Sequence, residues 1–373
     1  MISYFIPFII LTLLTSFEYS KKFDFLVRNK FLYFLVFLFF IIFIGLRYEI
    51  GCDWFDYKEM FEKYNALSLI EIIQRNLFFK QRIQELGHIF ITSISYNIYF
   101  LNLIYSILFT LPLFYFCSKL KRTYFSLLIS YPYYIIVVGM GPIRQAASIS
   151  IFMLSILFIS KRKFYSHILI TIISSLLHQS SILFNGLIMG SFSGHIKKIK
   201  LSKKNIILLL FISLVIVFSL PSLINKVYFY ISHYRHIMPG GSRLITPAKG
   251  AYYIWFINFI PSIIFLKNIK KFKFKKSLNK ILIILSIFEF LLLPIIFFNS
   301  IIAYRLLLYF FPSSIFITSY IPDLEILNIK KLYFLNIIIS SALISLIVWL
   351  KFAFHASCWV PYKNILLNST FIN

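Results

Sequence analysis

The sequence predicts an all-α polytopic integral membrane protein of about 11–13 transmembrane helices, with one or two larger outer loops. Its 373 residues are 60% hydrophobic and 20% aromatic, and only 13% are charged. Uncharged apolar runs recur along the chain, and basic residues gather between them. A spanning helix needs about 20 residues, so the chain has room for about a dozen passes and none for a sizeable soluble domain. We therefore expect residues 1–373 to form a single transmembrane domain.

Twelve apolar stretches are the predicted spans, and several are shorter than a full crossing. The first is preceded by no basic segment and followed by no small-residue cleavage site, which indicates a span rather than a cleaved signal. Over 86–118 we expect a short helix, a break at Asn97 and then a full helix, with 86–98 lying at half-membrane or interfacial depth. The spans are about 2–18, 31–46, 101–118, 124–139, 143–160, 164–178, 180–193, 205–222, 251–266, 281–298, 303–320 and 333–350.

The basic residues predict the orientation of the chain. Placing every basic patch on the cytoplasmic side satisfies the positive-inside rule, and it accounts for the net charge of +26 without nucleic acid as a partner. The patches are 21–30, 119–122, 161–163, 197–204, 267–280 and 328–331. The outer features are then a first large loop over 47–85, the connection 139–145 and a second loop over 221–250. The loop 47–85 holds seven of the twelve acidic residues, which marks it as unusual.

The three cysteines, Cys52, Cys117 and Cys358, lie far apart and have no metal-ligand spacing. Because their number is odd, they suggest no disulfide framework. We expect all three to be structurally neutral.

In this topology four arginines lie near the outer, non-cytoplasmic boundary of the membrane: Arg47, Arg144, Arg243 and Arg305. The positive-inside rule disfavours such positions, so an outer arginine is more informative than an inner lysine. The planar guanidinium suits bidentate binding of phosphate or pyrophosphate. The alternative is that each arginine snorkels to lipid phosphates or pairs with a nearby acid.

Two residues are candidates for acid–base chemistry. Asp53 follows the second span closely and can act as the base for a sugar hydroxyl, or it can cap a short helix beginning at Trp54 or pair with Arg47. His178 ends a span and is followed by polar residues. It can be an acid, a base or a hydrogen-bond donor to phosphate, or it can be a hydrogen-bonded structural residue. No Walker loop, G-x-S-x-G elbow or H-E-x-x-H motif is present, and no metal site is indicated.

Four segments, in order, resemble the EpsG-type branch of the Wzy-like polysaccharide polymerases. They are LRYEIGCDWFDY (46–57), ELGHIFI (85–91), PIRQAASISIF (142–152) and SSLLHQSSILF (174–184). The likeness covers roughly residues 40–190. The sequence departs from the family pattern at His88, where an aromatic residue is usual, and at Ser181, where a small apolar residue is usual.

The resemblance implies that lipid-linked oligosaccharide repeat units are joined at the periplasmic face of the bacterial inner membrane. The growing chain leaves undecaprenyl pyrophosphate and is transferred to a sugar hydroxyl of another lipid-linked unit, with no cofactor. The implied partners are donor and acceptor lipids and the bilayer, with a chain-length regulator and a flippase of the same pathway as further candidates. Our hypothesis for the site takes Asp53 or His178 as the base, with Asp53 as the first choice; Arg47 and Arg144, with Arg305 as a further candidate, on the pyrophosphate; Arg243 with Gly240 and Gly241 at the acceptor groove; Tyr57 and Gln145 as further contacts to the pyrophosphate or glycan; and Gly51 as a structural residue.

Two other functions remain alternatives. A flippase or exporter of the same lipid-linked glycan predicts charged residues in a central cavity and an internal repeat, and no repeat is evident. A membrane acyltransferase that modifies surface sugars would also place a histidine at a membrane boundary. The sequence leaves open which sugars are joined and whether the product is O-antigen, capsule or exopolysaccharide.

Overall fold

The described part of the chain is helical, and the only strand-like contact in it is a single bridge between Arg47 and Asn364. The computed structural model describes residues 1–65, 71, 85–161, 163–189, 250–324 and 330–367. Contacts divide the chain into two compact units, residues 1–153 with 318–373 (the first unit) and residues 154–317 (the second unit). The expectation of one transmembrane domain stays a prediction, and each unit is described by itself.

The first unit is built on long apolar helices with short polar caps. Asn29 caps α3, because its Oδ1 accepts hydrogen bonds from the backbone N–H groups of Phe31 and Leu32 at 2.8 and 3.2 Å. Asn97 caps α7 through Phe100 in the same way, at 2.7 Å. The helices are α1 (Ile2–Tyr19), α2 (Asp24–Val27), α3 (Lys30–Gly45), α4 (Trp54–Asn65), α6 (Leu86–Ser93), α7 (Ile98–Ser118), α8 (Thr123–Ser130) with the π-helix Tyr131–Val138, α9 (Ile143–Ser160) up to residue 153, and α20 (Lys331–Phe352).

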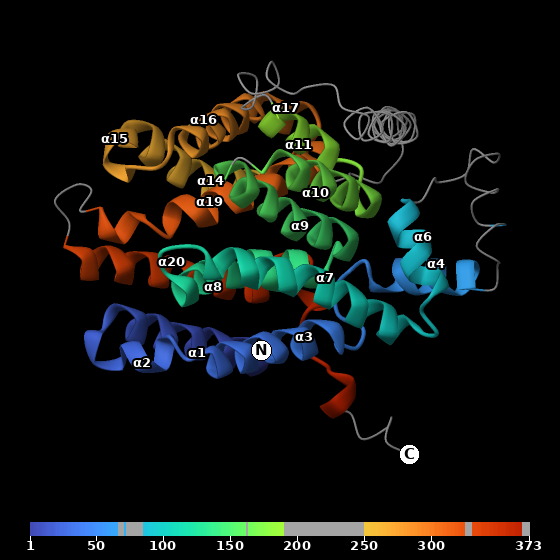
Figure 1. The fold of residues 1–373 in the computed structure, drawn as a ribbon. Helices are drawn as coiled ribbons and strands as arrows, with labels where there is room; N and C mark the ends of the chain where they lie inside the picture. Colours follow the sequence, from blue (N-terminus) through green and yellow to red (C-terminus); the bar gives the residue numbers. More distant parts are fainter. Residues whose placement is uncertain (66–70, 72–84, 162, 190–249, 325–329, 368–373) are drawn as a thin grey trace. The chain divides into compact units, whose positions relative to one another are not determined.

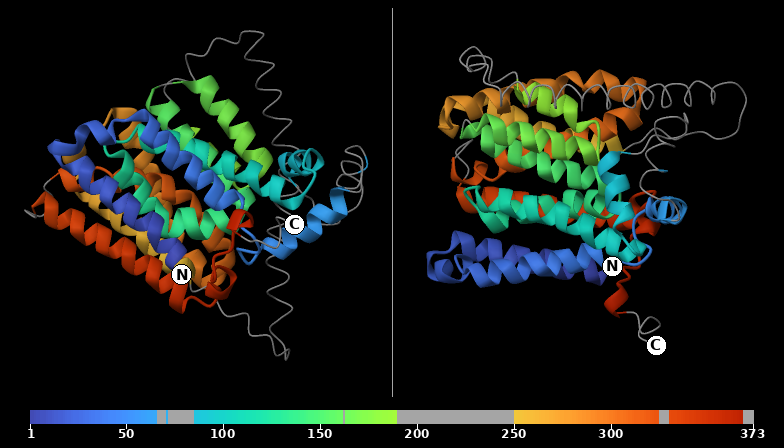
Figure 2. Two further views of the ribbon diagram at one scale, coloured as in Figure 1. Left: turned by 90° about the horizontal axis from the view of Figure 1, so that it is seen from below. Right: turned by 45° about the vertical axis from the view of Figure 1, so that its right-hand side comes forward.

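In the first unit α3 packs along α7 and α1 packs along α8 (Figure 1). Aromatic side chains join these helices. Phe40 of α3 packs against Phe114 of α7 and against Tyr131, which follows α8, and all three are buried. The Glu18 carboxylate of α1 accepts backbone hydrogen bonds at the start of α8, where an anion also favours the helix dipole. Figures 1 and 2 show α4 and α6 together beside one end of α7, which is where the candidate site lies.

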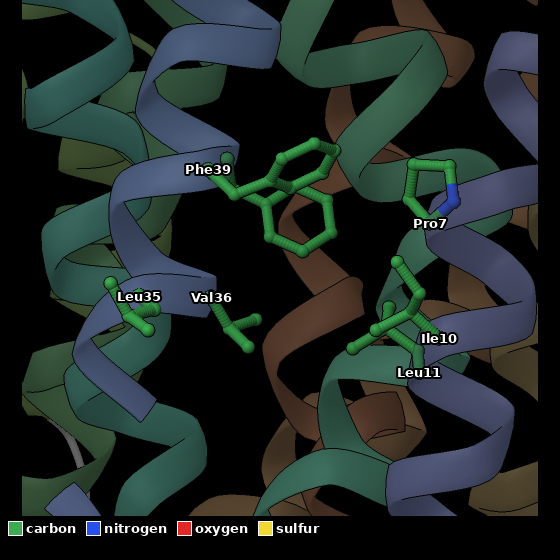
Figure 3. Close-up of a pocket in the computed structure, with 7 residues that line it drawn as sticks. Pro7, Ile10, Leu11, Leu35, Val36 and Phe39 are labelled. Carbon is green, nitrogen blue, oxygen red and sulfur yellow. The ribbon is translucent and has the colours of Figure 1, made fainter. Parts of the chain in front are cut away.

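Between α1 and α3 lies an apolar groove of about 210 Å³ (Figure 3). Pro7, Leu11 and Val36 are among the residues that line it, and none of its lining residues is charged. This groove therefore offers no acid, base or anion-binding group.

The segment after α20, residues 353–367, forms a strap across the loop that follows α3. Backbone hydrogen bonds join Gly51 N to Cys358 O at 2.9 Å and Tyr48 N to Lys363 O at 3.0 Å. A disulfide links Cys52 to Cys358 across 306 residues, and Cys117 is buried outside any disulfide. The expectation that all three cysteines are neutral was wrong, because an odd count leaves room for one bridge and such a long separation leaves no spacing pattern.

The second unit is also helical, and polar side chains join its helices in the apolar interior. Asn258 of α14 donates a hydrogen bond to the backbone carbonyl of Leu307 at 3.2 Å, and Ser262 of α14 donates one to Glu289 of α16 at 2.6 Å. Its elements after α9 are α10 (Phe164–Leu177), α11 (Ser181–Met189), α14 (Gly250–Lys267), α15 (Ile269–Phe272), α16 (Lys276–Leu291), α17 (Leu293–Phe298), α18 (Ser300–Leu307), a 3₁₀ turn (Leu308–Phe310) and α19 (Phe311–Thr318).

The helices confirm the predicted all-α polytopic membrane protein. By length and composition, six helical stretches among the described residues can cross a membrane, and four shorter apolar helices accompany them. The predicted short helix before Asn97 is α6, Leu86–Ser93, and α7 begins at Ile98. The six are Ile2–Tyr19, Ile98–Ser118, Gly250–Lys267, Lys276–Phe298, Ser300–Asp323 and Lys331–Phe352. The predicted span 205–222 and nearly all of the loop 221–250 lie outside the described residues.

Candidate functional site

The loop between α3 and α4 takes its shape from Gly51. Its φ is +96°, in the left-handed region that favours glycine. A Cβ at this position would lie 2.2 Å from the backbone carbonyl oxygen of Met140, so the loop and the segment before α9 approach too closely for any side chain. Gly51 therefore brings the loop that carries Asp53 against the chain that leads into Arg144.

Arg47 lies beneath this loop and is only 1% exposed. Its Nε and Nη1 donate to the backbone carbonyls of Ile50 and Ile44 at 3.1 and 2.7 Å, and its Nη2 donates to Asn102 Oδ1 at 3.1 Å. Burial lowers the pKa of Arg47 to about 10, so the side chain is still charged at neutral pH. These contacts favour a structural role, in which Arg47 fixes the turn after α3, over the predicted pyrophosphate contact.

Arg144, in the first turn of α9, forms an ion pair with Glu85. Its Nη1 lies 2.7 Å from Glu85 Oε2. The Glu85 side chain is 1% exposed, whereas that of Arg144 is 21% exposed. The carboxylate therefore anchors one edge of the guanidinium from inside the protein, while part of the arginine reaches the surface.

Tyr57, on α4, packs against Arg144. The Arg144 guanidinium carbon is 5.4 Å from the centre of the Tyr57 ring, a cation–π contact. Burial raises the pKa of the Tyr57 hydroxyl, and the charge of Arg144 only partly opposes that rise, so Tyr57 is neutral near pH 7. His88 packs against Tyr57, and its Nδ1 lies 2.8 Å from the hydroxyl of Tyr105.

Asp53 is the residue before α4 and is half-buried. The helix begins at Trp54, where the sequence predicted a helix start. Asp53 lies near enough to Tyr57 to act on it electrostatically, and it contributes to the raised pKa of that tyrosine. The first unit thus gathers Asp53, Tyr57 and Arg144 in one region, with Glu85 behind the arginine.

His178 lies in the second unit, at the residue that follows α10. Its Nδ1 is 2.6 Å from Ser180 Oγ, and Ser180 in turn donates to the hydroxyl of Tyr309 at 3.0 Å. Phe184 stacks on Tyr309 with 4.5 Å between the ring centres. The histidine ring is therefore held at Nδ1 by a serine of the turn between α10 and α11 and by a tyrosine of the 3₁₀ turn after α18.

The other predicted site residues have varied surroundings. Gln145, next to Arg144 in the first turn of α9, is 2% exposed and therefore lies in the protein interior. Arg305 is exposed in the last turn of α18, in the second unit. Arg243, with Gly240 and Gly241, lies outside the described residues.

The structure adds residues that sequence reasoning did not select. Glu85 lies inside the ELGHIFI segment, but only its contact with Arg144 reveals what it does. Tyr309 has no sequence signal, because it is one of 25 tyrosines. His355 lies with Cys52 and Cys358 in a group whose potential ligand atoms are within 4.8 Å of one another, and the disulfide occupies both sulfurs of that group.

This geometry has a definite chemical capacity. A buried acid holds a partly exposed arginine, which can place positive charge on a developing pyrophosphate leaving group. A half-buried carboxylate nearby can accept a proton from a hydroxyl, and the buried ring of Tyr57 supports the guanidinium.

Comparisons with known proteins agree with the segments that carry the resemblance. No curated protein and no solved structure matches the chain. Residues 30–364 match the EpsG family, and this range includes the loop after α3, Glu85, Arg144, His178 and most of the C-terminal strap. Because the match covers most of the 373 residues, the chain belongs to the EpsG family, a family of Wzy-like polysaccharide polymerases.

Proposed function

We propose that this protein polymerises undecaprenyl-pyrophosphate-linked oligosaccharide repeat units at the periplasmic face of a bacterial inner membrane, for O-antigen or a related surface polysaccharide. The observation that carries the proposal is the pairing of the partly exposed Arg144 with the buried Glu85. A lipid-linked pyrophosphate donor needs such a fixed cation and needs no nucleotide site. Membership of the EpsG family supports the same reaction class.

In this proposal Arg144 binds the donor pyrophosphate. An acceptor hydroxyl oxygen attacks C1 of the donor sugar, the bond between C1 and the pyrophosphate oxygen breaks, and undecaprenyl pyrophosphate leaves. Negative charge develops on that oxygen, and Arg144 stabilises it; loss of one such contact typically costs about 10²–10³ in rate. Glu85 keeps the guanidinium in place through its 2.7 Å contact.

We assign the acceptor base to Asp53, with His178 as the second candidate. Asp53 belongs to the same unit as Arg144, and its backbone carbonyl accepts a hydrogen bond at 3.0 Å from the N–H of Tyr57, whose ring contacts Arg144; both facts support the assignment. Asp53 would take the proton of the attacking hydroxyl as the new glycosidic bond forms. Tyr57 is buried against the Arg144 guanidinium and helps to hold it, and Gln145 and the exposed Arg305 remain candidate glycan and pyrophosphate contacts.

The test is a reconstituted reaction with purified protein and a defined lipid-linked repeat unit, in which polymer length and released undecaprenyl pyrophosphate are both measured. Arg144→Ala and Asp53→Asn should abolish both products, while the matched variant Asp56→Asn, which changes an exposed acid on α4, should retain them. Full-length polymer from Arg144→Ala at normal protein levels would reject the assignment. Loss of activity in His178→Asn but not in Asp53→Asn would move the base to His178.

The glycan profile of a deletion strain separates the alternatives. A polymerase defect leaves single repeat units that reach the outer surface. An exporter defect would trap lipid-linked units inside, and an acyltransferase defect would leave the ladder of chain lengths intact. Either of these two outcomes would replace the proposal.

A further inference from the structure

A second groove lies in the second unit, between α14 and α16, and differs from the groove between α1 and α3. Its volume is about 420 Å³. Phe259 and Ile263 of α14 and Phe290 of α16 give it apolar walls, while Lys267, Ser262 and Ser286 add polar groups. None of these residues belongs to the candidate site for polymerisation.

The polar groups are arranged by depth. Lys267 ends α14 and is exposed, whereas Ser262 lies five residues earlier, about 7.5 Å further along the helix axis. Ser262 is engaged, because it donates to the fully buried Glu289 at 2.6 Å. Ser286 is 2% exposed, and its hydroxyl has no hydrogen-bond partner in the described part of the protein. Burial of a hydroxyl without a partner is costly, so a ligand that accepts its hydrogen bond would be stabilised.

The mouth of the groove is strongly basic. The segment 267–280, which continues from α14 through α15 into α16, holds seven lysines and no acid. All seven of these lysines are exposed. The positive-inside rule places this segment on the cytoplasmic side, where the leaflet surface is anionic. Basic pockets between transmembrane helices on this side suit lipid phosphates.

We propose that the groove between α14 and α16 binds one anionic phospholipid of the cytoplasmic leaflet. Its phosphate lies at Lys267 and the basic segment, and one acyl chain lies along Phe259, Ile263 and Phe290. The ester carbonyls of a phospholipid lie just beneath its phosphate, and we assign the hydroxyl of Ser286, which lines the groove, to one of them.

The groove between α1 and α3 is the internal comparison (Figure 3). Its lining is wholly apolar, with Leu35 and Phe39 at its edge and no charged residue. An acyl chain can lie there, but nothing in its lining selects an anionic headgroup. Of these two grooves, only the one between α14 and α16 should therefore select lipids by charge.

The test is native mass spectrometry of the full-length purified protein with phosphatidylglycerol or phosphatidylcholine of identical acyl chains. The parent protein should retain one phosphatidylglycerol in preference to phosphatidylcholine. Lys267→Ala should lower that occupancy about five-fold, the effect expected for one lysine near an anionic headgroup. The matched variant Lys30→Ala removes an exposed basic residue at the start of α3 and should change nothing.

Steric variants test the position of the acyl chain. Ile263→Trp should fill the groove and abolish retention, while Leu35→Trp, in the comparison groove, should leave it unchanged. Leu266→Trp, at a lining position that is 40% exposed, provides a second block should Ile263→Trp lower the melting temperature. Ser286→Ala should weaken retention of both lipids, because both have ester carbonyls.

Three outcomes would overturn the proposal. They are equal retention of the two phospholipids by the parent protein, unchanged retention in both Lys267→Ala and the blocked variants, and displacement of phosphatidylglycerol by equimolar undecaprenyl phosphate. The last would assign the groove to a carrier lipid instead.

Discussion

Arg144 and Glu85 form an ion pair of 2.7 Å although 59 positions separate them in the chain. Glu85 is the residue before α6, yet its carboxylate makes no capping hydrogen bond to that helix. It is committed to the guanidinium of α9 instead. The helix start therefore gives up a local stabilising contact, and Arg144 gains a fixed orientation.

Glu85→Gln should reduce polymerisation while the protein still folds. The amide keeps the shape of the side chain but loses the charge that holds Arg144, and a misplaced catalytic contact can cost about 10²-fold in rate. The measurement is the rate of undecaprenyl pyrophosphate release. Glu59→Gln, at an exposed position on α4, is the control and should be fully active. A normal rate in Glu85→Gln would mean that Arg144 needs no such anchor.

Arg47→Lys should lower stability more than it lowers activity per folded molecule. A lysine keeps the charge but cannot reproduce the three directed contacts to Ile44, Ile50 and Asn102. Leaving buried carbonyls without donors should cost about 1–3 kcal/mol for each group, seen as a lower melting temperature in detergent. Unchanged melting together with loss of polymer would instead return Arg47 to the substrate-binding residues.

Gly51→Ala should destabilise the protein, and Gly186→Ala should not. At position 51 the backbone has a positive φ, and a Cβ would meet Met140 O at 2.2 Å, so the loop must move. At position 186, inside α11, a Cβ would meet nothing within 4 Å, and alanine should stabilise the helix by about 0.5–1 kcal/mol. The comparison is the difference in melting temperature between the two variants. Equal shifts in melting temperature would contradict the close approach between position 51 and the backbone of Met140.

Replacing Cys52 and Cys358 together with serine should lower the stability of the first unit. Loss of a native disulfide typically costs about 2–5 kcal/mol. Thiol labelling of the unfolded parent protein should find one reactive cysteine without reductant and three with it, because Cys117 lies outside the bridge. Three reactive cysteines in the absence of reductant would show that the bridge does not form in the cell.

The predictability of the fold differed between its parts. The apolar runs and the basic residues between them were enough to predict the helices, because helix formation and membrane insertion both depend on the composition of a local stretch of chain. The signals for a break at Asn97 and for a helix start after Asp53 were also local, and the structure has helices beginning at both places.

The contacts that define the candidate site were not predictable in the same way. The resemblance selected Arg144, but nothing adjacent in sequence connects it to Glu85. Arg47 and Arg144 have similar sequence surroundings, each near the end of an apolar helix, yet one is 1% exposed and meets backbone carbonyls while the other meets a carboxylate. Partners far apart in the chain decide such roles, and one sequence carries no record of them.

The strap at residues 353–367 makes the order of synthesis matter. The loop after α3 leaves the ribosome early, but Cys358 and Lys363, which hold it through Cys52 and Tyr48, are made more than 300 residues later. The loop that carries Asp53 therefore reaches its final shape only after α20 has entered the membrane. A nascent or truncated chain would carry Asp53 and Arg144 without the bridge, so the loop of the candidate site can be closed only when the chain has been made as far as Cys358.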